Sequence, residues 1–102
     1  MTKVVYKYPI ELDDLQKIQM PIKSNILTVK IQDGKLCLWA EVTPEFEIEP
    51  VLIKVVGTGH RDFIEEWDQY IGTVQDDRFV WHVYRGQLWT APSKEIDNAT
   101  TY

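Results

Sequence analysis

The chain has 102 residues, of which 44% are hydrophobic and 12% aromatic, and its formal net charge is −5. This length and composition indicate one globular domain with a single core, and they exclude an intrinsically disordered chain. The negative charge disfavours non-specific binding to nucleic-acid phosphates or anionic membranes, and no apolar run reaches the roughly 20 residues of a membrane span.

Cys37 is the single cysteine, so the chain cannot form an internal disulfide. This fits the reducing environment of a cytoplasm. The first three residues lead directly into an alternating stretch rather than into a signal peptide. We therefore expect a cytoplasmic protein without a membrane segment.

Two short alternating stretches open the chain. In residues 3–10, Pro9 lacks the N–H that a central strand would donate, so we expect an edge strand. Residues 11–14 are typical of a turn, and residues 16–20 predict a second, half-buried strand, which Pro21 ends. The apolar face of the first strand holds Val4, Tyr6, Tyr8 and Ile10.

Residues 26–42 predict a β-hairpin. Asp33 and Gly34 stand between two alternating runs, and this dipeptide favours a type I′ turn, which needs positive φ at both central positions. One face is then wholly apolar, and a slip of one residue would turn it to the other side, so a single register is expected. The expected pairs are Gln32 with Lys35, Ile31 with Leu36, Val29 with Leu38 and Leu27 with Ala40, and on the other face Lys30 with Cys37 and Thr28 with Trp39.

An acidic connection and a buried strand follow the hairpin. Glu45, Glu47 and Glu49 alternate within residues 43–50, and no other ligand residues converge on them. We therefore expect a solvated connection there rather than a metal site. Residues 51–56 are almost continuously β-branched, which is typical of a strand buried on much of both faces.

A second hairpin is predicted toward the end of the chain. In the expected register Gly72 faces Trp81, a pairing in which an aromatic ring covers a bare glycine. The expected elements are a loop with a turn over residues 63–69, strands over residues 70–75 and 78–85, and a hairpin turn at Asp76 and Asp77.

Seven short strands without a long amphipathic helix predict an all-β fold. We expect mainly antiparallel strands in a small sandwich or a partly open barrel. We expect residues 1–86 to form the single β domain and residues 87–102 to form a polar C-terminal extension, mobile or docked on a neighbour. The core is expected where the hairpin of residues 26–42 meets that of residues 70–85.

The residues that carry acid–base or metal chemistry are few and show no recognised spacing. His60, His82, Asp62 and Cys37 form no metal-binding motif, and no serine has an adjacent base. We expect His82 to be packed and hydrogen-bonded, and Cys37 to be a small buried hydrophobe. The sequence therefore predicts neither an enzyme nor a metal or cofactor site.

Residues 57–61 have the features of a binding site. Two glycines let the backbone present successive N–H groups to an anion. A hydroxyl and an imidazole add hydrogen-bonding groups, and a guanidinium fits phosphate or carboxylate. The same pattern also fits a tight turn required by geometry alone. The candidate ligand-binding residues are Gly57, Thr58, Gly59, His60 and Arg61, with aromatic contacts from Trp67, Tyr84 and Trp89.

Five motifs are spaced along residues 4–84. They are Val-Tyr-Lys-Tyr-Pro-Ile at residues 5–10, Leu-Cys-Leu-Trp-Ala at 36–40, Gly-Thr-Gly-His at 57–60, Tyr-Ile-Gly-Thr at 70–73 and Val-Trp-His-Val at 80–83. Together they resemble a family of small uncharacterised proteins of tailed bacteriophages and prophages. The resemblance implies a phage accessory protein that works in the bacterial host cytoplasm, and it brings no established catalytic residues.

Two functions from different classes remain open. The first is a small phage binding protein that sequesters a nucleotide-type immune signal of the host, or another small anionic ligand, by analogy with other small phage proteins. The second is an interaction module that acts on a host or phage protein, or a structural accessory in assembly. In either case we expect a homo-oligomer, because the 12 aromatic residues exceed what one small core buries.

Overall fold

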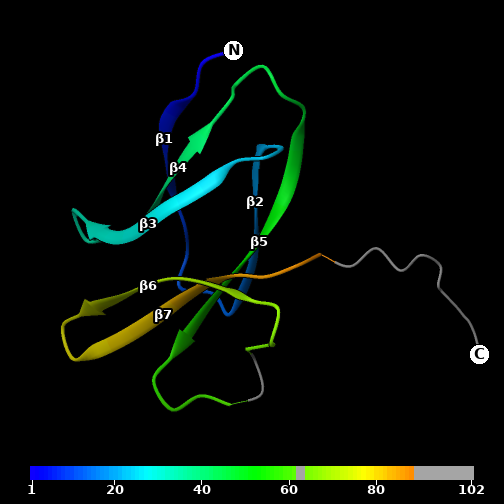
Figure 1. Ribbon diagram of the computed structural model, residues 1–102. Coiled ribbons are helices and arrows are strands. Elements are labelled where there is room, and N and C mark those ends of the chain that lie inside the picture. The colour runs from blue at the N-terminus through cyan, green and yellow to red at the C-terminus, as the bar shows by residue number, and fades with distance from the viewer. Residues whose placement is uncertain (62–63, 89–102) are drawn as a thin grey trace, which may run out of the picture.

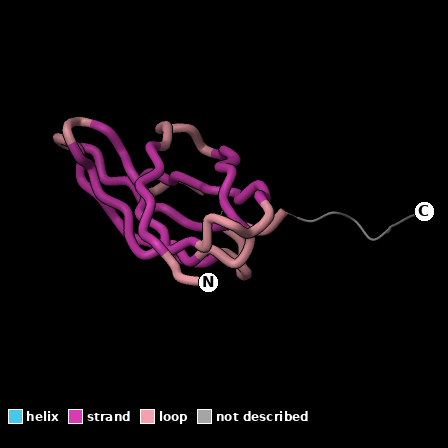
Figure 2. Tube along the Cα trace, turned by 90° about the horizontal axis from the view of Figure 1, so that it is seen from above, coloured by secondary structure: helices cyan, strands magenta, loops and turns pink. Residues whose placement is uncertain are grey.

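The computed structural model describes residues 1–61 and 64–88, so that only residues 87 and 88 of the predicted extension are described. The described residues form seven β-strands in two antiparallel sheets (Figure 1), and Figure 2 shows no helix among them. The all-β prediction is confirmed, with the strands in two sheets that do not close into a barrel. The strands are β1 (Val4–Pro9), β2 (Leu15–Pro21), β3 (Asn25–Gln32), β4 (Lys35–Val42), β5 (Ile48–Gly57), β6 (Gln69–Asp76) and β7 (Phe79–Arg85).

The first sheet has the strand order β1-β4-β3, and the second has the order β2-β5-β7-β6. β1 therefore lies at a sheet edge, as its proline predicted. The chain passes from one sheet to the other after β1, after β2 and after β4. As a result, the hairpin β3–β4 and the hairpin β6–β7 belong to different sheets.

The hydrophobic core lies between the two sheets. Val29 on β3 lies so close to β6 that a Cβ on Gly72 would stand 2.9 Å from the Val29 Cγ1 atom. The two hairpins therefore meet in the core, as the sequence predicted. The buried core residues are Ile10, Met20, Val29, Leu36, Leu38, Ala40, Val42, Val51, Ile53, Val55, Val74 and Val83.

The first hairpin has the predicted turn. Asp33 and Gly34 have φ of 51° and 76°, both positive as a type I′ turn requires. The predicted pairs hold from Gln32 with Lys35 back to Thr28 with Trp39. The pairing of Leu27 with Ala40 is wrong, because a bulge between Ile26 and Thr28 brings Ile26 opposite Ala40. Leu27 is left 46% exposed, while Ile26 packs against the core.

Gly34→Val is expected to destabilise the fold by about 1–2 kcal/mol or more, because a β-branched residue is strained at positive φ. Chemical denaturation measures this loss. Asp33→Asn is the matched control, since asparagine tolerates the left-handed region, and its stability should stay within about 0.5 kcal/mol of the wild type. Equal stability of Gly34→Val and the wild type would contradict a type I′ turn.

The second hairpin turns one residue later than predicted. Asp76 belongs to β6, and the centre of the turn is formed by Asp77, whose φ is 57°, and Arg78. The predicted pairing of Gly72 with Trp81 is therefore wrong. The pairing partner moves by two positions, so each side chain keeps its predicted face. The observed pairs are Asp76 with Phe79, Gln75 with Val80, Val74 with Trp81, Thr73 with His82 and Gly72 with Val83.

β5 is buried on both faces, as predicted, but it starts earlier. The ladder with β2 extends to Pro21, which pairs with Ile48, so the strand takes in part of the predicted acidic connection. Lys54 is buried on the outer face of the strand, where its Nζ lies 2.7 Å from Oδ2 of Asp68. The described part of the predicted loop, residues 64–68, is thus tied to this face of the second sheet.

Candidate functional site

The segment after β5 forms the tight turn that its glycines predicted. The backbone N–H of His60 donates to the carbonyl oxygen of Gly57 at 3.1 Å. Gly59, the third residue of the turn, has a φ of 89°, which fits a type II turn. The N–H of Thr58 donates to the carbonyl oxygen of Val80 at 3.4 Å. The turn is therefore fixed to β7, the neighbouring strand.

A chain of side-chain hydrogen bonds starts at this turn. The Oγ1 atom of Thr58 lies 2.8 Å from Nε2 of His82, and Nδ1 of the same ring lies 3.0 Å from Oγ1 of Thr73. Thr73 also bonds the hydroxyl of Tyr70. His82 is the hydrogen-bonded histidine that the sequence predicted, and it holds the hydroxyl of Thr58 in place.

A surface groove of about 450 Å³ lies between this turn and the start of β7. Phe79 and Trp81 stack along it, with ring centroids 6.0 Å apart and planes inclined by 22°, and Phe79 is 59% exposed. His60 and Arg78 also line the groove, and an imidazole and a guanidinium both offer hydrogen-bond donors. The lining residues are Gly57, Thr58, His60, Arg78, Phe79, Val80 and Trp81.

Because Gly57 has no side chain, the rings of His60 and Trp81 can pack close to the backbone of the turn. A Cβ there would lie 3.3 Å from both Cε1 of His60 and Cζ3 of Trp81, closer than optimal carbon–carbon contact. A larger residue would therefore displace the imidazole or the indole. The turn predicted from the glycines is confirmed, and the same geometry sets His60 beside the aromatic wall of the groove.

Arg61, the predicted anion contact, lines a different cleft from Arg78. This cleft has a volume of about 200 Å³, and it shares His60 with the groove. Its other lining residues include Asp14, whose carboxylate disfavours an anion. The structure therefore brings Gly57, Thr58 and His60 to the groove but places Arg61 outside its lining. Gly59 lines neither space.

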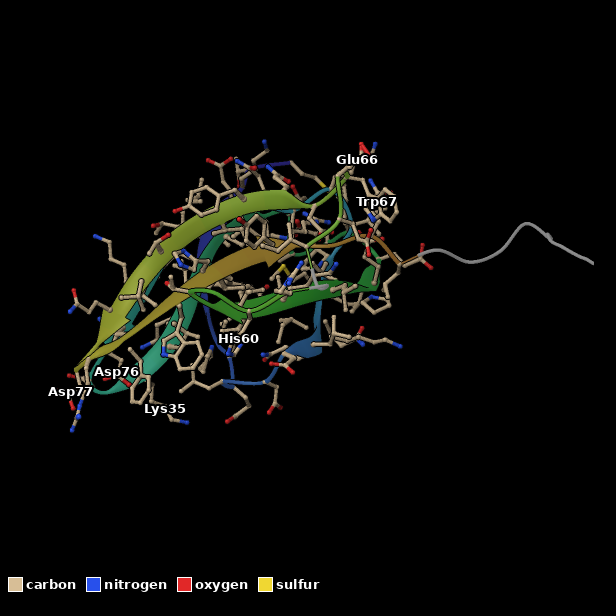
Figure 3. All side chains as sticks on the ribbon, turned by 90° about the horizontal axis from the view of Figure 1, so that it is seen from below. Lys35, His60, Glu66, Trp67, Asp76 and Asp77 are labelled. Carbon is tan, nitrogen blue, oxygen red and sulfur yellow. The ribbon has the colours of Figure 1, made fainter. Side chains whose placement is uncertain are left out.

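Two of the three aromatic residues proposed from the sequence lie away from the groove. Trp67, which is 47% exposed, lies beside Glu66, and Figure 3 shows them at the end of the molecule opposite the turn of the second hairpin. Tyr84 packs edge-on against Tyr70, with ring centroids 5.5 Å apart. Trp89 lies outside the described residues.

Sequence reasoning missed Arg78, Phe79 and Trp81 as site residues. Phe79 and Trp81 stand two positions apart and so share a strand face, which is the signal that the sequence offered. Their approach to the turn depends on the pairing of β5 with β7, which sets Trp81 opposite Gly57. That pairing joins strands that are distant in the sequence, so no local pattern predicts it.

Within residues 1–61 and 64–88, no group of three or more His, Cys, Asp or Glu side chains is arranged to hold a metal ion. In the same part of the chain, no helix is long and apolar enough to cross a membrane. The model of a protein family, the domain of unknown function DUF7352, matches residues 1–91. No curated protein and no solved structure matches the chain.

Proposed function

The chain belongs to the DUF7352 family, domains of unknown function, and we propose that it binds a small anionic ligand with a planar ring, of nucleotide type, in the groove beside β7. The observation that carries this proposal is that Arg78 and His60 line the same groove as the stacked rings of Phe79 and Trp81. Phe79 and Trp81 offer surfaces on which a base can stack. Arg78 can donate charge-assisted hydrogen bonds to phosphate, and the ring N–H of His60 can donate another.

The charge of the groove differs from that of the whole chain. The formal net charge is −5, so an anion meets repulsion over most of the surface. None of the described residues that line the groove is acidic. Arg78 adds a positive charge to this lining, so the groove is a local exception where an anion can bind.

The phage resemblance extends this proposal to a biological role. A small accessory protein in the host cytoplasm would sequester a nucleotide-type immune signal of the host by binding it in this groove. Sequestration needs tight binding but no turnover. This agrees with a sequence in which no nucleophile and base stand at a recognised spacing.

Identification of any small molecule that co-purifies with the protein tests the proposal. Wild-type protein isolated from a bacterial host should release, on denaturation, a molecule with nucleobase absorbance that mass spectrometry identifies. Arg78→Ala purified in parallel should release much less. Lys30→Ala, which removes an exposed cation of β3 outside the groove, should release as much as the wild type. A stoichiometric protein companion without any small molecule would instead favour the interaction module.

β1 supports the expectation of a homo-oligomer. It forms a free edge of the first sheet, and Val4, Val5 and Tyr6 are exposed there. Exposed apolar edge strands are the places where sheets add strands from other chains. We expect a dimer mass by light scattering coupled to size exclusion, and Val5→Lys should shift this mass toward the monomer. A wild-type monomer at tens of micromolar would contradict the expectation.

A further inference from the structure

A second surface cavity, of about 180 Å³, lies where the turns of the two hairpins come together. Part of its wall is fixed core: Ile10 and Leu36 are 4% and 6% exposed. The backbone N–H of Ile10 donates to the carbonyl oxygen of Leu36 at 2.9 Å, so the pairing with β4 continues past the end of β1. The apolar residues that line the cavity are Ile10, Leu12, Ile31, Leu36 and Trp81.

Charged side chains of both signs also line this cavity. Glu11, Lys35 and Asp76 are exposed there, and Figure 3 shows Lys35 and Asp76 at the same end of the molecule. In the described part of the chain, neither Glu11 nor Asp76 forms an ion pair. Two carboxylates against one ammonium give the lining an excess of negative charge, which favours a cation and disfavours an anion.

We propose that this cavity binds a small organic cation that carries one apolar ring, an arylalkylamine being the simplest example. A cavity of roughly 150 Å³ lined by aliphatic and aromatic side chains holds benzene, so a volume of about 180 Å³ accommodates one such ring. The apolar wall favours the ring, and the carboxylates of Glu11 and Asp76 attract the ammonium group.

The cavity and the anion groove select ligands of opposite charge. Trp81 lines both spaces. Arg78 and His60 line the groove and not the cavity, so they do not act on a cation bound here. Glu11 and Asp76 line the cavity and not the groove. The two ligands therefore depend on different charged side chains, and this proposal stands independently of the proposed function.

Ligands that share a phenyl ring and differ in charge test the proposal. Phenethylamine is a cation at neutral pH, phenethyl alcohol is uncharged, and hydrocinnamate is an anion. Isoleucine δ1-methyl signals in two-dimensional NMR spectra report binding, because Ile10 and Ile31 line the cavity. Ile18 and Ile26, which are half-buried elsewhere, provide reference signals. Phenethylamine should shift the signals of Ile10 and Ile31 saturably and should bind about tenfold more tightly than phenethyl alcohol. Hydrocinnamate should bind more weakly still.

Surface variants test the carboxylates without changing the apolar wall. Glu11→Gln combined with Asp76→Asn removes both negative charges and keeps the side-chain shapes. In this double variant phenethylamine should bind no more tightly than phenethyl alcohol, whose own affinity should stay unchanged. Asp13→Asn removes an exposed carboxylate outside the lining and should keep the preference for the amine.

Three results would each overturn the proposal. The first is that phenethylamine causes no saturable shift of Ile10 and Ile31 in the wild type. The second is that hydrocinnamate binds the wild type as tightly as phenethylamine does. The third is that the double variant keeps the preference for the amine, or that Asp13→Asn loses it to the same extent as the double variant.

Discussion

Lys54→Met is expected to lower the free energy of unfolding by about 3–5 kcal/mol, the usual cost of removing one partner of a buried ion pair. Nζ of Lys54 lies 2.7 Å from Oδ2 of Asp68, and the two side chains are 8% and 0% exposed. The backbone N–H of Glu65 donates to the same oxygen at 2.7 Å. Oδ1 is buried and has no partner among the described residues, so the variant leaves a carboxylate buried with too few hydrogen bonds.

Urea denaturation measures this change, and two further variants control it. Lys3→Met removes an exposed pair, in which Nζ of Lys3 lies 3.8 Å from Oε1 of Glu41, and should cost less than about 1 kcal/mol. Lys54→Met combined with Asp68→Leu removes both buried charges and should recover most of the stability. Equal losses for Lys54→Met and Lys3→Met would contradict a structural role for the buried pair.

Leu38→Ala is expected to lower the free energy of unfolding by about 2–5 kcal/mol, the range for truncating a buried leucine. Leu38 is 0% exposed. It lies on the central strand of the first sheet, opposite Tyr8 on one side and Val29 on the other. Because β4 is paired along both edges, the sheet has little freedom to collapse into the cavity that the substitution leaves.

Leu27→Ala is the matched control for this truncation. Leu27 sits at the bulge of β3 and is 46% exposed, so its truncation should cost about 1 kcal/mol or less. Urea denaturation of both variants gives the comparison. Similar losses at Leu38 and Leu27 would contradict the placement of the core between the sheets.

The first hairpin could be predicted almost pair by pair because its information is local. Asp33 and Gly34 accept positive φ, and the alternation on each side admits one register. The bulge at Leu27 could not be predicted, since Ile26 and Leu27 are equally apolar and either fits the inner face. Which of them points inward depends on how β3 packs against β6 in the other sheet. The local sequence pattern does not predict that contact.

The second hairpin shows the limit of turn prediction. Asp76 and Asp77 are the same residue type, and either tolerates the left-handed conformation that a turn needs. The sequence therefore located the turn to within one residue but could not choose its centre. The side chains still lie on the predicted faces of the strands, because the pairing partner moved by two positions.

Part of the lining of the candidate groove could be predicted from the sequence. The turn that contains Gly57 and His60 follows from glycine chemistry, and so does its position at a strand end. The cation that lines the groove is Arg78 rather than Arg61. That exchange depends on the pairing of β5 with β7, which brings the far end of the second hairpin beside the turn.

Calorimetric titration of a panel of nucleotides into the wild type and Arg78→Ala tests the anion groove most directly. We expect saturable binding of at least one nucleotide to the wild type, an affinity about tenfold or more lower in Arg78→Ala, and a melting temperature that is nearly unchanged. The affinity should also fall as salt is raised. Arg61→Ala tests whether the ligand also contacts the smaller cleft. A comparable loss of affinity in this variant would indicate that the site extends past His60 into that cleft. Absence of binding to the wild type, or equal affinity in Arg78→Ala, would contradict the account.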